Sequence, residues 1–74
     1  MSPEKLVHMA NQIATFFRTQ PGTDQADRVA QHLRDYWDPR MRAQIVQIAE
    51  SGESGLSPLA AEAVARLQSP VGGA

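Results

Sequence analysis

Hydrophobic residues recur at three- and four-residue spacing in separate stretches of this chain, and that is the period of an amphipathic helix. The first stretch follows Ser2-Pro3, a helix-start signal, and ends at the breaker Gln20-Pro21-Gly22. We therefore expect a first helix over about residues 3–19. Its apolar face comprises Leu6, Met9, Ala10, Ile13, Phe16 and Phe17.

A second helix is predicted to begin at Thr23 or Asp24, either of which can cap it, and to end at the Trp37-Asp38 corner. Asp24 and Asp27 suit the positive end of its dipole. Its apolar side comprises Ala26, Val29, Ala30, Leu33, Tyr36 and Trp37.

Asp-Pro and Ser-Pro pairs mark two further helix starts, because the first residue can cap the helix and proline suits its first position. The third helix begins at Asp38-Pro39 and stops at Ser51-Gly52. The fourth follows the cap Ser57 and covers about 58–68. The apolar residues of the two helices are Met41, Ile45, Ile48 and Ala49, and then Leu59, Ala60, Ala63, Val64 and Leu67.

These patterns predict an all-α fold, a small compact bundle of three to four short helices. We expect one helical domain over residues 1–68 and a flexible tail over 69–74. A chain of 74 residues buries only about 60% of its extended surface, so its stability alone should be marginal. It has no cysteine and only two histidines, which leaves a partner protein as the expected supplement to its core.

The charge balance and hydropathy bear on partners and location. Seven basic and eight acidic residues give a net charge of −1, which offers no general attraction to nucleic acid. No apolar run approaches the roughly 20 residues of a membrane span, and the N-terminus lacks the features of a signal peptide. We expect a cytoplasmic protein without membrane or nucleic-acid partners.

A search for catalytic or metal-binding groups gives no candidate. His8 and His32 fall on different predicted helices without a second ligand at a recognisable spacing. His8 is expected on a solvated face and His32 at a packing or partner contact. The serines lie at predicted caps or loops, where no base accompanies them. We therefore expect no catalytic, cofactor-binding or metal-binding residue, and no independent enzyme.

The segment from Tyr36 to Arg42 carries the strongest signal, because it joins the only tyrosine and the only tryptophan to two arginines. Tyrosine, tryptophan and arginine are enriched at interface hot spots. Arginines in a first helical turn also need an anionic partner, which is either Asp35 and Asp38 within the chain or carboxylates on another protein. The predicted partner-binding residues are Tyr36, Trp37, Arg40, Met41, Arg42, Arg34 and His32. Trp37, Arg40 and Arg42 could instead lock two helices together internally.

The second and third helices also allow a different function, that of a small helix-turn-helix-like DNA-binding regulator. Arg40 and Arg42 would open its reading helix, which offers Gln44 and Gln47 to bases. The net negative charge and the lack of a wider basic stripe disfavour this alternative.

The chain resembles a known family over nearly its whole length, and two motifs carry this resemblance. Met9-Ala10-Asn11-Gln12-Ile13-Ala14, followed by Phe16-Phe17, and the later Trp37-Asp38-Pro39-Arg40-Met41-Arg42 are similar to the delta subunit of soluble, NAD-dependent formate dehydrogenases that contain molybdenum or tungsten.

The resemblance implies a non-catalytic accessory subunit that binds the large catalytic subunit of a cytoplasmic complex. Its role would be assembly, stabilisation or support of cofactor insertion. It also implies that the pterin-bound metal, the iron-sulfur clusters and the FMN of such a complex lie in other subunits, with no cofactor in this chain.

Overall fold

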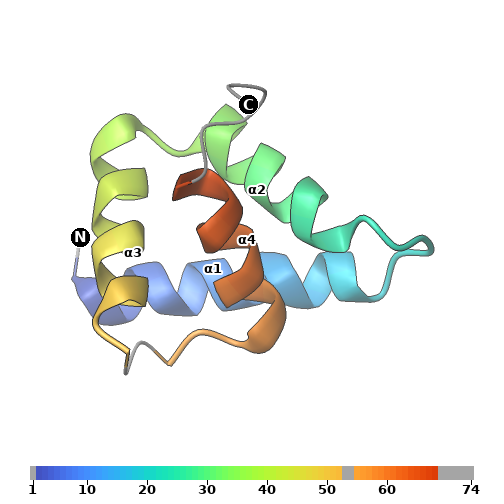
Figure 1. Ribbon diagram of the computed structural model, residues 1–74, viewed down its shortest axis with the longest axis horizontal. Helices are drawn as coiled ribbons and strands as arrows, with labels where there is room; N and C mark the ends of the chain where they lie inside the picture. Colours follow the sequence, from blue (N-terminus) through green and yellow to red (C-terminus); the bar gives the residue numbers. More distant parts are fainter. Residues whose placement is uncertain (1, 53–54, 69–74) are drawn as a thin grey trace.

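Four α-helices and no strand are present in residues 2–52 and 55–68, the parts of the chain that the computed structural model describes (Figure 1). The predicted small all-α bundle is therefore confirmed. The predicted tail, residues 69–74, lies outside the described residues. The helices are α1 (Pro3–Arg18), α2 (Gln25–Tyr36), α3 (Pro39–Glu50) and α4 (Pro58–Gln68).

Three of the four helices begin with the predicted capping chemistry. The side-chain oxygens of Ser2, Asp38 and Ser57 each accept a hydrogen bond from the amide three residues later, at 3.3, 2.8 and 3.3 Å. Each cap satisfies an amide that has no partner within its helix. At the end of α3, Gly52 adopts a positive φ of 89°, as expected for a residue that closes a helix.

The start of α2 differs from the prediction. Asp24 occupies the cap position, but its side chain makes no capping hydrogen bond, and both carboxylate oxygens accept from Arg28 Nε at 3.1 Å. The backbone of Asp24 is not extended, unlike that of a typical capping residue, which explains why the carboxylate turns outward. The hydrogen bond from Arg28 lowers the pKa of Asp24. The preceding turn is held by Gln25, whose Nε2 donates to the carbonyls of Gln20 and Gly22.

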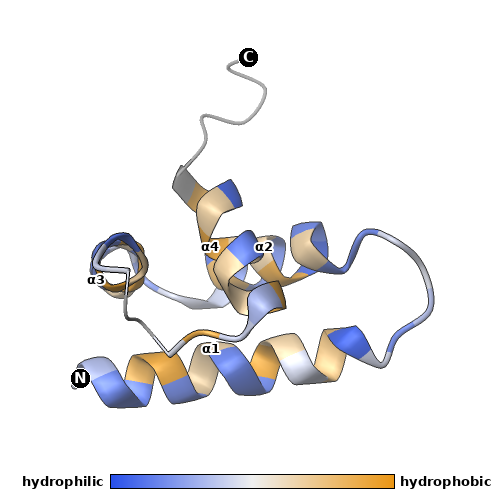
Figure 2. Cartoon of the chain, turned by 60° about the horizontal axis from the view of Figure 1, so that its bottom comes forward, coloured by the Kyte–Doolittle hydropathy of each residue, from blue (hydrophilic) through white to orange (hydrophobic). Residues whose placement is uncertain are grey.

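The hydrophobic core lies where α1 runs across one side of the other three helices (Figure 2). Many of its members are alanines, which allow the helix backbones to approach closely. α2 and α4 share the most extensive contact of any helix pair. The fully or nearly buried residues of the core are Leu6, Ala10, Ala14, Val29, Ala30, Leu33, Trp37, Ile45, Ala60, Ala63 and Val64.

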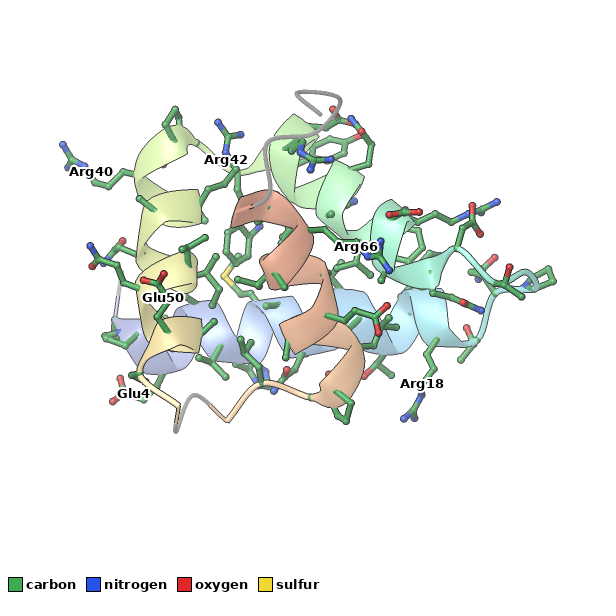
Figure 3. The ribbon with its side chains drawn as sticks, viewed as in Figure 1. Glu4, Arg18, Arg40, Arg42, Glu50 and Arg66 are labelled. Atoms are coloured by element: carbon green, nitrogen blue, oxygen red, sulfur yellow. The ribbon has the colours of Figure 1, made fainter. Side chains whose placement is uncertain are left out.

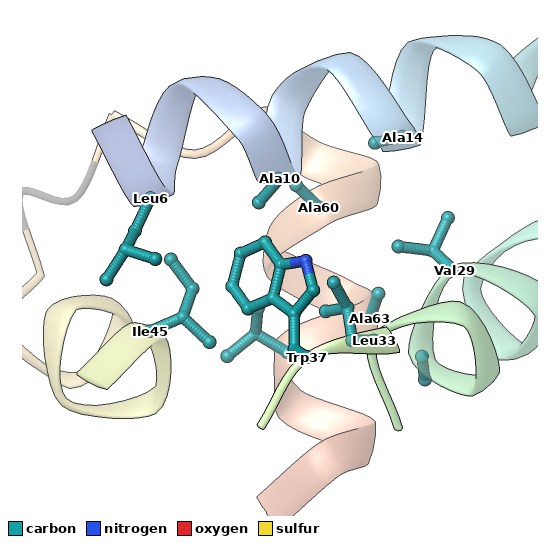
Figure 4. Packing of buried hydrophobic residues seen from close by; sticks show 11 residues of the cluster. Leu6, Ala10, Ala14, Val29, Leu33, Trp37, Ile45, Ala60 and Ala63 are labelled. Carbon is teal, nitrogen blue, oxygen red and sulfur yellow. The ribbon is translucent and has the colours of Figure 1, made fainter. Parts of the chain in front are cut away.

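Trp37 is the largest side chain of this core. It is the residue directly after α2, and only 5% of it is exposed. Figure 4 shows its ring between α1 and α4, close to Ala10 and Ala60, with Ile45 of α3 on one side. The small alanines leave the space that the indole fills. The corner between α2 and α3 is thus anchored to the two helices that are farthest from it in sequence.

Asn11 fixes the segment that leads into α4. Its Nδ2 donates to the carbonyl of Gly55 at 3.0 Å, and its Oδ1 accepts from the amide of Ser57 at 2.8 Å. An amide side chain can satisfy both a donor and an acceptor of an irregular backbone, which an apolar residue cannot. This contact gives Asn11, which belongs to one of the two motifs, a structural role.

We predict that Trp37→Ala destabilises the fold by about 3–5 kcal/mol, the usual cost of removing a buried aromatic side chain. A small domain has little stability to lose, so the variant should be largely unfolded at 37 °C. Urea denaturation followed by far-UV circular dichroism measures the change. Trp37→Phe, which retains most of the apolar contact, should lose less. A Trp37→Ala variant with the wild-type midpoint would contradict the burial of Trp37 in this core.

Candidate partner-binding surface

The structure places the seven predicted partner-binding residues in four different environments. They do not form one surface, although six of them lie within nine residues of the chain. Trp37 lies in the core and Met41 packs against it; Arg34 and Arg42 bind helix ends; His32 and Tyr36 stand in a row of aromatic rings; Arg40 is exposed on α3.

Arg42 closes the C-terminal end of α2. Its Nη1 donates to the carbonyls of Arg34 and Trp37, each at 2.8 Å. These carbonyls belong to the end of α2, where no intrahelical donor remains and the helix dipole is negative. The guanidinium is partly buried in this position. The arginine therefore finds its negative partner in the preceding helix.

Arg34 acts on α4 in the same way. Its Nη2 donates to the carbonyl of Arg66 at 3.1 Å, in the last turn of α4. The side chain of Arg66 (Figure 3) forms an ion pair with Asp27 of α2 at 3.1 Å and a second one with Glu62 of its own helix at 2.9 Å. Both contacts raise the pKa of Arg66, and the hydrogen bond to Glu62 contributes more to this shift than the charge of Asp27. Because the ion pairs are largely exposed, their contribution to stability is small.

Neither aspartate that we considered as an internal partner neutralises the arginines of α3. Asp38 accepts the capping bond from Met41, and Asp35 accepts a hydrogen bond from Gln31 at 2.9 Å. The sequence feature that could have predicted the contact of Arg42 with α2 is the two-residue corner between α2 and α3. Such a short connection places the first turn of one helix beside the last turn of the other.

Four rings form a continuous row across α1 and α2, which we call the aromatic row: Phe16, Phe17, His32 and Tyr36. Successive ring centroids lie 5.2, 6.0 and 4.6 Å apart. Both ends of the row are exposed, since 60% of Phe16 and 75% of Tyr36 is accessible to solvent. Phe16 and Tyr36, which the periodicity assigns to the apolar sides of the first two helices, are therefore directed mostly to solvent.

Local backbone geometry separates the two members of each consecutive aromatic pair. Neighbouring residues of a helix are about 100° apart, so two consecutive bulky rings point in different directions. In α1, Phe17 packs against the core while Phe16 is exposed. Trp37 follows α2 with an extended backbone, and it is buried while Tyr36 is exposed. The sequence shows two such pairs, but periodicity alone does not say which member of each pair is inside.

A hollow of about 270 Å³ opens beside this row. Its lining is predominantly apolar, and its two polar side chains are those of Gln12 and His32. The other residues that line it are Ile13, Phe16 and Phe17.

Arg40 lies away from the aromatic row. Its side chain points outward from α3 (Figure 3), is exposed and forms no hydrogen bond or ion pair with any residue that the structure describes. Arg40 is thus available to a partner, whereas Arg42 is held by α2.

Residues 2–52 and 55–68 contain no group of three or more His, Cys, Asp or Glu side chains placed to hold a metal ion. Among the described helices, none has both the length and the apolar character needed to cross a lipid bilayer.

We predict that Arg42→Ala lowers the free energy of unfolding by about 1.5–3 kcal/mol, because two carbonyls lose a charged donor. Arg40→Ala is the matched control, since it removes the same side chain from the same helical turn without breaking a contact, and it should change stability by less than about 0.5 kcal/mol. Chemical denaturation of both variants measures the difference. Equal stabilities would contradict a helix-closing role for Arg42.

Comparison with known proteins assigns the chain to a family. Residues 5–64 match the family described as NADH-dependant formate dehydrogenase delta subunit FdsD. No curated protein and no solved structure gave a match. The matched segment includes both motifs, all seven predicted partner-binding residues and the aromatic row. The chain belongs to the family of NADH-dependent formate dehydrogenase delta subunits.

Proposed function

We propose that this chain is a non-catalytic subunit that binds the large catalytic subunit of a cytoplasmic, NAD-dependent formate dehydrogenase and supports its assembly, stability or cofactor insertion. The observation that carries the proposal is the exposed aromatic row on a chain of the delta-subunit family. Its two end rings, Phe16 and Tyr36, are the large hydrophobic side chains that are exposed in residues 2–52 and 55–68.

The exposed rings favour a protein partner on energetic grounds. Moving a large apolar side chain from water to a packed interior is worth about 1.5–3 kcal/mol. Phe16 and Tyr36 each retain most of that gain for a contact outside the chain, because more than half of each is exposed. Tyrosine also keeps a hydroxyl that can remain hydrogen-bonded at an interface.

The composition of the chain supports placing the redox cofactors in other subunits. Iron-sulfur clusters are held mainly by cysteine thiolates, and this sequence has no cysteine. We therefore propose that the iron-sulfur clusters of the complex are bound by its larger subunits. From the family resemblance we propose the same for the pterin-bound molybdenum or tungsten and the FMN.

DNA binding, the alternative function, stays a prediction, and the contacts that Arg42 of α3 makes do not favour it. DNA binding by α3 requires Arg40 and Arg42 to face phosphates together. The guanidinium of Arg42 is already engaged by two carbonyls of α2, so only Arg40 of this pair is free to do so.

Co-expression with the large catalytic subunit tests the proposal. We expect the chain to copurify with the tagged large subunit, and we expect formate-dependent reduction of NAD by the complex to fall when the chain is omitted during expression. The purified chain alone should show no turnover of formate.

Two controls accompany that experiment. An unrelated tagged protein should not retain the chain, and duplex DNA should not bind it saturably at physiological salt. Failure to copurify, together with saturable and salt-dependent DNA binding, would replace the proposed function with the regulatory alternative.

A further inference from the structure

We draw no further inference here: the strongest candidate, the apolar hollow beside the aromatic row between α1 and α2, carries nothing beyond the proposed function because nothing in the structure shows what covers it.

Discussion

The burial of Trp37 is the interaction on which the arrangement of the other helices depends. Asp38 caps α3 and Pro39 is its first residue, so the chain turns directly after Trp37. The ring fills the space that the alanines of α1 and α4 leave, and it brings the corner into contact with both helices. Without the indole, the corner itself would lose its contact with α1 and α4, and the packing of α2 and α3 on α1 would rest on the smaller side chains of the core.

Arginine side chains then hold the helix ends that the core does not reach. Arg42 closes α2 and Arg34 closes α4, while Arg66 returns from α4 to α2. Each of the first two satisfies carbonyls that would otherwise depend on water. Of the three arginines predicted to bind a partner, Arg34 and Arg42 thus bind helix ends within the chain, whereas the Arg40 side chain makes no such contact with the described residues.

The sequence was sufficient to predict the helices and most of their caps, because those depend on local chemistry. Asp38-Pro39 and Ser57-Pro58 have the same meaning wherever they stand before an apolar repeat. The roles of the site residues depend on contacts between distant segments. Arg42 donates to a carbonyl of the preceding helix, and Asn11 binds a loop more than forty residues away. Helical periodicity, which concerns residues three or four positions apart, predicts neither contact. The Asp24 side chain was predicted incorrectly because its backbone conformation, and not its residue type, decides whether it can cap α2.

The two pairs of consecutive aromatic residues connect the fold to the proposed partner. In α1 the helical step of about 100° separates the directions of Phe16 and Phe17, and at the end of α2 the extended backbone of Trp37 accompanies an inward indole while Tyr36 stays outside. The inward rings of Phe17 and Trp37 belong to the core or pack against it, so they hold α1 and α2 in place and thereby fix where the outer rings stand. Phe16 and Tyr36 consequently mark the two ends of one row, although twenty residues separate them in the chain. A surface of this kind needs no catalytic group or bound metal, because the same residues that complete a small core also define the position of the rings that remain exposed.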